Sequence, residues 1–176
     1  MEQHESEAAL AIVGLMAVSA RTAPKARGYD TIKTAVVHGE GLPCLADAMD
    51  ILASERNLPF FARDAANIRA SAACLLVGVD SAPLNLDCGA CGYCRCADLP
   101  EAGGDADYAG PLCHFKTLDL GIALGSAAKT ASMHNADNRV MYTAGVAARR
   151  LGLLDADMVV AIPVSVTGKN IFFDRG

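Results

Sequence analysis

Positive charge is scarce in this chain of 176 residues. The chain has 15 Lys and Arg residues and 20 Asp and Glu residues, which gives a formal net charge of −5 at pH 7. The basic residues form no cluster along the sequence. Proteins that bind nucleic acid need a basic face that replaces phosphate counterions, and an acidic membrane surface demands the same. The composition therefore disfavours both kinds of partner.

The chain also has no apolar run of membrane-spanning length. The nearly apolar run at residues 8–20 (AALAIVGLMAVSA) has 13 residues, whereas a spanning helix needs about 20. The residues before it, MEQHESE, are acidic, and a signal peptide would begin with positive charge. We therefore expect a buried helix here. With no export signal and an odd number of cysteines, seven, we expect a cytoplasmic protein whose thiols bind metal rather than pair.

Several signatures of catalysis are missing as well. Gly168 and Lys169 lack the earlier glycine of a phosphate-binding P-loop. No Ser-His-Asp or Cys-His pair is supported by its spacing. The sequence therefore predicts neither nucleotide hydrolysis nor another hydrolytic mechanism, and it assigns no catalytic and no organic-cofactor-binding residue.

The residues that are present indicate a folded protein. Apolar residues make up 52% of the chain and charged residues 20%, which excludes disorder, and the length fits a single domain over residues 1–176. Helices and strands mix along the chain, so we expect an α+β fold in which a mixed sheet is flanked by helices in three layers. Apolar periodicity predicts helices over 6–19, 45–56, 62–70, 118–133 and 139–151, and strands over 31–38, 72–79, 158–164 and, at the end, 171–173.

Small residues are frequent in the last two predicted helices. Gly121, Gly125 and Gly145 lie among alanines there. Side chains this small allow close approach of a helix to another helix, to a sheet or to a second subunit. Cys74, by contrast, lies inside the apolar strand at 72–79, where we expect it to behave as a small hydrophobic residue.

Five of the seven cysteines lie within a cysteine-rich loop at residues 87–113, namely Cys88, Cys91, Cys94, Cys96 and Cys113. Glycines adjoin the first two cysteines. A thiolate cage needs several sulfurs brought to one point by tight turns, which small residues permit. The loop therefore predicts an iron–sulfur site. Four cysteines can hold a [2Fe–2S] or a [4Fe–4S] cluster, so the number of irons stays open.

The spacing of these cysteines can be interpreted in two ways. The first three give C-x2-C-x2-C, the opening of a bacterial ferredoxin motif, but its next cysteine would stand where Asp98 is. Omitting Cys94 gives C-x2-C-x4-C-x16-C and accounts for the remote Cys113. A zinc ribbon would need a second C-x2-C pair, and Lys116 occupies the position of its last member.

The second spacing resembles the small four-cysteine iron–sulfur domain of electron-transfer and corrinoid proteins. That resemblance implies a [4Fe–4S] cluster with Cys88, Cys91, Cys96 and Cys113 as ligands. Cys94 is then left over. A wider resemblance, to the DUF2148 family of "ferredoxin domain-containing" proteins, rests on residues 110–113 (GPLC), 118–126 (LDLGIALGS), 137–142 (DNRVMY) and 161–175 (AIPVSVTGKNIFFDR).

A weaker resemblance connects the chain with the nitroreductase fold. Residues 20–24 (ARTAP), followed by the strand at 33–37, are similar to the opening of those flavoenzymes. Residues 148–153 and the strand at 158–163 are similar to their closing helix and strand. This resemblance implies an α+β scaffold, a homodimer with the Ala- and Gly-rich helices as its interface, and FMN as a second cofactor.

These observations predict a cytoplasmic redox protein that holds one [4Fe–4S] cluster and transfers electrons to a partner not identified by the sequence. One alternative is an FMN-dependent oxidoreductase. Its cofactor phosphate would bind a loose basic group around Pro24, composed of Arg21, Lys25, Arg27 and Lys33, which is otherwise solvated surface charge. Another is a sensor or binding module in which the cluster is structural or reports oxidation. His114 next to Cys113 is either a partner of a cluster sulfide or a surface histidine.

Overall fold

The computed structural model describes residues 3–104 and 106–173. Helices and strands are mixed along the chain, with two short 3-10 helices. They are α1 (Gln3–Thr22), η1 (Ala26–Gly28), β1 (Ile32–His38), α2 (Gly41–Arg56), α3 (Pro59–Ala70), β2 (Ala73–Val79), η2 (Cys96–Asp98), α4 (His114–Met133), β3 (Asp137–Asn138), α5 (Tyr142–Arg150) and β4 (Met158–Ser165).

The four strands form one sheet in the order β1-β2-β4-β3. All pairings among the described strands are antiparallel, so the mixed sheet that we expected is antiparallel here. Val79, the last residue of β2, pairs with Ile32 at the start of β1 and with Met158 at the start of β4. One end of the sheet therefore carries the exit of β2 and the entries of its two neighbours.

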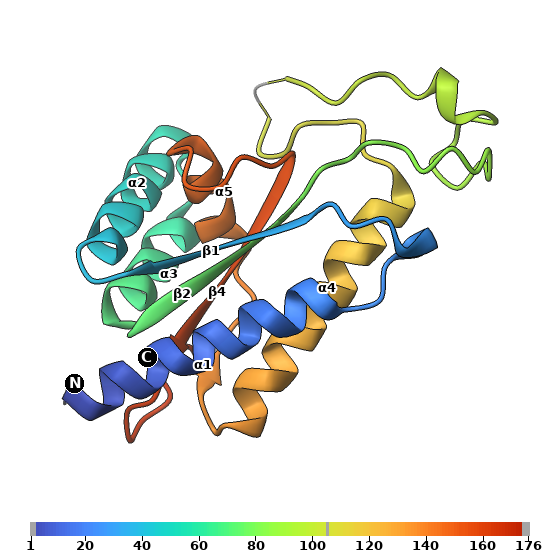
Figure 1. Ribbon diagram of the computed structural model, residues 1–176. Helices are drawn as coiled ribbons and strands as arrows, with labels where there is room; N and C mark the ends of the chain where they lie inside the picture. Colours follow the sequence, from blue (N-terminus) through green and yellow to red (C-terminus); the bar gives the residue numbers. More distant parts are fainter. Residues whose placement is uncertain (1–2, 105, 174–176) are drawn as a thin grey trace.

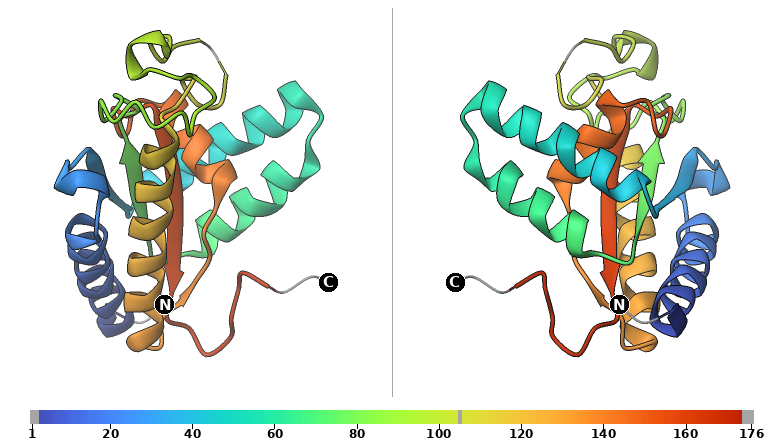
Figure 2. Two further views of the ribbon diagram at one scale, coloured as in Figure 1. Left: turned by 90° about the vertical axis from the view of Figure 1, so that its right-hand side faces the viewer. Right: turned by 90° about the vertical axis from the view of Figure 1, so that its left-hand side faces the viewer.

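Helices cover both faces of the sheet and confirm the expected three-layer α+β fold. Figure 2 shows α1 and α4 on one face, and α2, α3 and α5 on the other. Successive side chains of β2 point to opposite faces: Leu75 and Val77 belong to the apolar core under α1 and α4, whereas Cys74 and Leu76 belong to the core under the other helices. Every residue of β2 is buried, as its continuous apolar run predicts.

The predicted helices are confirmed, although α1, α2, α3 and α4 each begin three or four residues earlier than expected and α5 begins three residues later. The buried residues of α1 (Ala9, Val13, Met16 and Ala20) recur at helical spacing and face the sheet. Helix α2 begins at Gly41 because the first turn of a helix tolerates proline, here Pro43. Helix α4 begins directly after Cys113. Among the described helices, none is long and apolar enough to cross a membrane.

The strand predicted at residues 171–173 is wrong, because these residues form bends. The side-chain oxygen of Asn170 accepts a hydrogen bond from the N–H of Phe172 at 2.9 Å, which closes a turn. The Asn170 amide also donates to Asp137 on β3. The short strand β3 occupies the sheet edge beside β4 instead.

The glycines of α4 and α5 differ in their surroundings. Gly145 of α5 lies directly against the backbone of Val159 and Val160 in β4, where a Cβ would collide. The expected close approach of helix to sheet is confirmed at this residue. Gly121 and Gly125 of α4 face open space.

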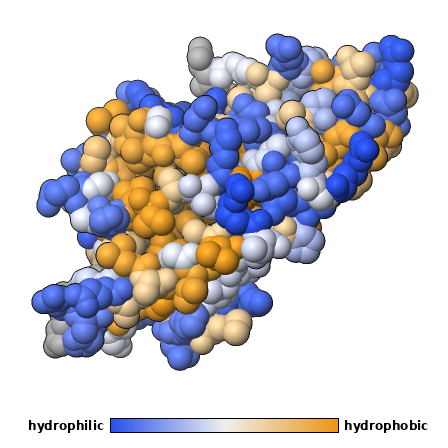
Figure 3. Space-filling model, in the orientation of Figure 1, coloured by the Kyte–Doolittle hydropathy of each residue, from blue (hydrophilic) through white to orange (hydrophobic). Residues whose placement is uncertain are grey.

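The opposite edge of the sheet, β1, is partly open to solvent. Figure 3 shows apolar surface gathered where β1 crosses between α1 and α2. Exposed apolar side chains of these three elements include Val18, Val36 and Ile51. The cysteine-rich loop lies away from this area, beyond the end of the sheet (Figure 1).

Candidate functional site

The chain between β2 and α4 projects from the end of the sheet and carries the candidate site. It leaves β2 after Val79 and returns at His114, the first residue of α4. Figures 1 and 2 show it as an extended loop over that end of the molecule, above the N-terminus of α4. Loops on a rigid scaffold are a common place for binding and redox groups.

Two reciprocal hydrogen bonds between Asp87 and Cys96 close the central part of this loop. The N–H of Cys96 donates to Oδ1 of Asp87 at 2.7 Å, and the N–H of Asp87 donates to Sγ of Cys96 at 3.3 Å. Asp87 has a φ of 48°, in the left-handed region that Asp tolerates. The backbone N–H of Asp87 thus points at the sulfur of Cys96, as backbone N–H groups do at the ligand sulfurs of iron–sulfur centres.

A tight turn lies inside this closed part of the loop. The N–H of Gly92 donates to the carbonyl of Gly89 at 3.0 Å. Both glycines have a positive φ, 69° and 90° respectively, which L-residues with a side chain rarely adopt. The turn places Cys88 before it and Cys91 within it, as the glycine-flanked cysteines predict.

Cys113 occupies a different position, at the N-cap of α4. It is buried, and its carbonyl accepts hydrogen bonds from the N–H groups of Lys116 and Thr117, the first turn of the helix. The fold therefore holds the remote cysteine in place at the start of a long helix.

The remaining cysteines differ in exposure and position. Cys94 is exposed within the loop, Cys44 is exposed in the first turn of α2, and Cys74 is buried in β2. Burial raises the pKa of the Cys74 thiol from 9.0 to about 12, as suits the hydrophobic role expected of it. His114, the first residue of α4, is exposed.

The four predicted ligands share one end of the molecule but surround no single ion. Within residues 3–104 and 106–173, no three His, Cys, Asp or Glu side chains lie close enough to hold one metal ion. A four-iron cluster is wider than a single ion, and its ligand sulfurs stand correspondingly further apart. The donor chemistry fits such a cluster: four thiols, of which Cys96 accepts a backbone N–H and Cys113 lies at a helix N-terminus.

Most of the basic group around Pro24 is neutralised by acidic side chains. Arg21 pairs with Asp30 at 2.7 Å, and Lys33 pairs with Asp80 at 2.9 Å; the same carboxylate of Asp80 raises the pKa of Lys33 through a hydrogen bond. Lys25 is bonded to backbone carbonyls nearby. A phosphate site built from all four basic residues is therefore disfavoured.

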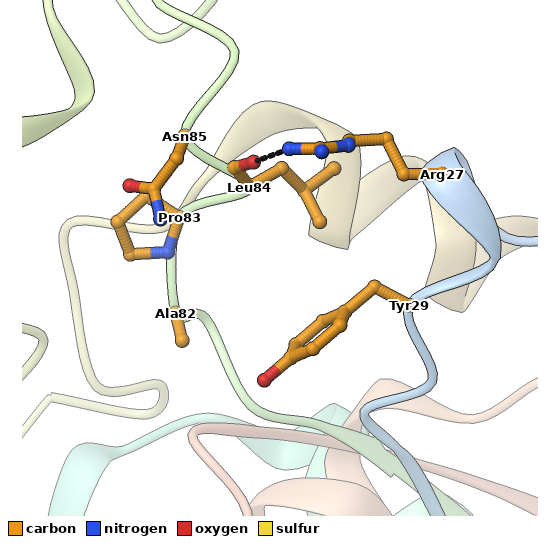
Figure 4. A pocket seen from close by; sticks show the side chains of 6 residues that line it. All are labelled: Arg27, Tyr29, Ala82, Pro83, Leu84 and Asn85. Carbon is orange, nitrogen blue, oxygen red and sulfur yellow. Dashed lines mark hydrogen bonds between the residues drawn. The ribbon is translucent and has the colours of Figure 1, made fainter.

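Arg27 is the member of this group that contacts the segment leading into the cysteine-rich loop. Its guanidinium donates to the carbonyl of Leu84 at 2.8 Å. Within the described chain it has no carboxylate at ion-pair distance. Figure 4 shows its side chain extending over a cavity of about 340 Å³, with the ring of Tyr29 on the other side. Residues 82–85 complete the lining.

A second cavity of about 540 Å³ is partly lined by the same segment and reaches Cys96. Ser81 and Asp157 stand at its base, where the Asp157 carboxylate accepts hydrogen bonds from both the N–H and the hydroxyl of Ser81 at 2.8 Å. The segment 82–85 thus borders two cavities, and each lies next to the cysteine-rich loop.

Sequence reasoning missed a buried charged pair just after Cys113. Lys116 is fully buried, and Asp119 is 3% exposed. The Lys116 ammonium donates to the carbonyl of Tyr29 at 2.8 Å and lies 3.7 Å from the Asp119 carboxylate. Helical spacing could have indicated that this pair is buried, because Lys116 and Asp119 share a face of α4 with the apolar residues Leu120 and Ala123.

Known structures with the same architecture are nitroreductases and related flavoproteins. A putative NADH dehydrogenase/NAD(P)H nitroreductase from Bacteroides thetaiotaomicron aligns over 96% of this chain and 76% of its own, with a TM-score of 0.56 and 14% identity. The nitroreductase-like family protein of Bacillus cereus aligns over 97% and 77%, with a TM-score of 0.56 and 11% identity. A nitroreductase with bound FMN from Desulfitobacterium hafniense aligns over 96% and 80%, with a TM-score of 0.53 and 15% identity. The chain therefore has a nitroreductase-like fold.

Sequence comparison then identifies the family. An uncharacterized protein of Archaeoglobus fulgidus is 43% identical over 163 residues, which are 92% of this chain and 88% of that protein. Residues 109–175 match the model of DUF2148, described as an uncharacterized protein containing a ferredoxin domain. This chain belongs to the DUF2148 family, as its motifs predict.

Proposed function

We propose that this chain is a redox protein that holds one [4Fe–4S] cluster through Cys88, Cys91, Cys96 and Cys113 and transfers electrons. The observation that carries the proposal is that the fold holds two of the four predicted ligands in place. Cys96 is held by Asp87, and Cys113 is held at the start of α4, whereas Cys88 and the spare Cys94 are both exposed. Membership of a family described by a ferredoxin domain supports the same function.

A bound cluster of this kind supplies one-electron transfer. The residues of this chain have two tasks toward it. The four thiolates would hold it, and the N–H of Asp87, which already points at the sulfur of Cys96, would help to set its potential, because hydrogen bonds to ligand sulfurs tune iron–sulfur centres. Burial of Cys113 would limit solvent access on that side.

Anaerobic purification tests the proposal. We expect brown protein with about four irons and about four acid-labile sulfides per chain, the content of one [4Fe–4S] cluster. Dithionite should bleach the visible absorption and produce an EPR signal of a one-electron-reduced cluster. Protein that contains no iron or sulfide after reconstitution under anaerobic conditions would contradict it.

A matched pair of variants tests the ligand assignment. Cys96→Ser should lose most of the iron, because it removes a ligand. Cys94→Ser should retain it, because Cys94 has no place in the C-x2-C-x4-C-x16-C spacing. The reverse result would support the ferredoxin-like spacing, in which Cys94 is a ligand.

A second candidate function is that of an FMN-dependent oxidoreductase. Solved structures with this fold include an oxidoreductase containing FMN and a nitroreductase with bound FMN. The cavity between Arg27 and Tyr29 offers a guanidinium and an aromatic ring beside the cysteine-rich loop, which suits an aromatic cofactor with an anionic group. Stoichiometric FMN released on denaturation would favour this function, and its absence together with a full cluster would argue against it.

A further inference from the structure

The short segment at residues 26–29 touches both parts of the candidate site, and we call it the brace. On one side, the N–H of Ala26 donates to Oδ1 of Asp119 at 2.9 Å, and the carbonyl of Tyr29 accepts from Lys116 at 2.8 Å. On the other side, Arg27 donates to the carbonyl of Leu84 at 2.8 Å (Figure 4). The brace therefore connects the first turns of α4 to the segment that leads into the cysteine-rich loop.

The residues that the brace contacts, Lys116 on α4 and Leu84 before the loop, each lie close in sequence to a predicted ligand or its partner. The N–H of Lys116 donates to the carbonyl of Cys113 at 3.0 Å, so Lys116 is in the same helical turn as that cysteine. Leu84 precedes Asp87 by three residues, and Asp87 closes the loop on Cys96. Contacts through the brace thus extend from Cys113 to the region of Cys96, two cysteines that are otherwise separated by a long irregular segment.

The brace and the α4 residues that contact it retain two features that are unfavourable for stability alone. Arg27 has φ 57° and ψ 11°, a left-handed conformation that costs free energy in a residue other than glycine. Lys116 and Asp119 are charged groups removed from water, and Oδ2 of Asp119 has no hydrogen-bond partner within the described chain. Desolvation of such a pair is costly, so its net contribution to stability is small or negative.

We propose that Arg27 and Lys116 are positioning residues that fix the separation between Cys113 and the cysteines of the loop. Neither is a ligand. A cluster bound by both parts of the chain requires them to stand at a defined separation, and the brace supplies it before the cluster binds, which lowers the entropy cost of ordering the loop. This inference rests on the proposed function.

The test compares Arg27→Gly with Arg95→Ala in the full-length chain. Glycine keeps the left-handed turn while removing the bond to Leu84. Arg95 is an exposed arginine of the loop that pairs with Asp98, so its removal is a matched control. In the apo-protein we expect Arg27→Gly to speed amide hydrogen exchange several-fold at residues 84–96, with an unchanged thermal midpoint, and Arg95→Ala to leave exchange at the brace and at Leu84 as in wild type.

The reconstituted proteins give the second measurement. Arg27→Gly should lose iron to a chelator several-fold faster than wild type and show an altered EPR spectrum in the reduced state, because ligand geometry changes. Arg27→Lys, which can still donate to Leu84, should restore slow release. Lys116→Met should behave like Arg27→Gly if it folds.

Two failures are distinguishable. If wild type holds a cluster but Arg27→Gly matches it in exchange, iron release and spectrum, the inference is wrong and the proposed function stands. If wild type holds no iron after reconstitution, the proposed function is wrong and the positioning role falls with it.

Discussion

At the scale of single residues, Gly145 shows how tightly α5 is packed on the sheet. A Cβ at this position would overlap the backbone carbonyl of Val159, and backbone in a central strand cannot move aside. We therefore expect Gly145→Ala to lower the free energy of unfolding by about 3 kcal/mol, the upper range for overpacking. Urea denaturation followed by circular dichroism measures the change.

Gly14→Ala is the control for this substitution. Gly14 lies in α1, and a Cβ there meets nothing within 4 Å. We expect it to leave stability unchanged or raise it by up to about 1 kcal/mol, since alanine is the better helix former. Equal effects of the two substitutions would show that packing against β4 is not what Gly145 provides. The sequence predicted close approach by the small residues of α4 and α5, but it did not show which of them face the sheet.

Cys74 gives a prediction about pH. Desolvation raises the pKa of its thiol from 9.0 in the unfolded chain to about 12 in the folded protein. Between these two values the unfolded chain loses a proton that the folded protein keeps, so the stabilisation is complete below pH 9 and decreases as the pH rises toward 12. At about pH 10.5 the loss attributable to Cys74 should approach about 2 kcal/mol relative to pH 8.

Urea denaturation at these two pH values, in wild type and Cys74→Ala, isolates this contribution. Tyr142 also has a pKa raised to about 12, chiefly by burial and by its hydrogen bond to Asp107, and it acts in the same direction. The contribution of Tyr142 is the same in both proteins. The difference between them in how the free energy of unfolding changes with pH, smaller in Cys74→Ala, therefore measures the contribution of the thiol. Identical pH dependence in the two proteins would contradict the buried, protonated state of Cys74.

At the scale of elements, the carboxylate of Asp64 links α3 to the segment that leads into α5. It is 3% exposed and accepts hydrogen bonds from the Thr143 hydroxyl at 2.9 Å, from Arg139 at 3.2 Å and from Arg63. Removing one partner of a buried ionic network leaves the others unpaired. We expect Asp64→Ala to reduce the free energy of unfolding by about 3 kcal/mol.

Asp47 provides the comparison on the surface. It pairs with Arg69 at 2.5 Å, but its side chain is 69% exposed. Exposed ion pairs contribute little, so Asp47→Ala should cost less than about 1 kcal/mol. Urea denaturation of both variants measures the two changes in the free energy of unfolding. If Asp64→Ala costs no more than Asp47→Ala, the buried network does not hold α3 and α5 together.

The helices and strands were predictable where apolar periodicity and burial agree. The continuous apolar run of β2 and the spacing in α1 are examples. Prediction failed at residues 171–173, where the backbone N–H of Phe172 donates to the side-chain oxygen of Asn170 and closes a turn instead of pairing in a strand. It also placed the start of α4 too late, because the first turn begins with polar residues whose role depends on tertiary contacts with the brace.

At the scale of the whole molecule, the sequence predicts candidate ligands but not the contacts that hold them. Cysteine spacing is a local property, so the candidate ligands could be found without a structure. The contacts of Lys116 with Tyr29 and of Arg27 with Leu84 join residues 87 and 57 positions apart. Motifs and apolar periodicity describe residues that are close in sequence, so they cannot predict such distant pairs, which only the folded chain brings together.

Homodimer formation stays a prediction at this scale. The outward face of α4 presents Gly121, Gly125 and the exposed apolar side chains of Leu118 and Ile122. If the Ala- and Gly-rich helices form the interface, sedimentation velocity should find a dimer for wild type and a monomer for Ile122→Glu. A wild-type monomer at micromolar concentration would contradict the homodimer.

The arrangement of the two apolar cores predicts how the whole chain unfolds. Both cores include side chains of β2, Leu75 on one side and Leu76 on the other. If the sheet came apart, the apolar cores under both layers of helices would therefore be exposed to water together. We propose that the chain is one domain and expect one cooperative transition, in which the calorimetric and van't Hoff enthalpies agree. Gly145→Ala, which perturbs only the core under α5, should then speed the global hydrogen exchange of α1 and α4 as much as that of α2. Two separate transitions, or faster exchange confined to one layer, would show that the layers unfold independently.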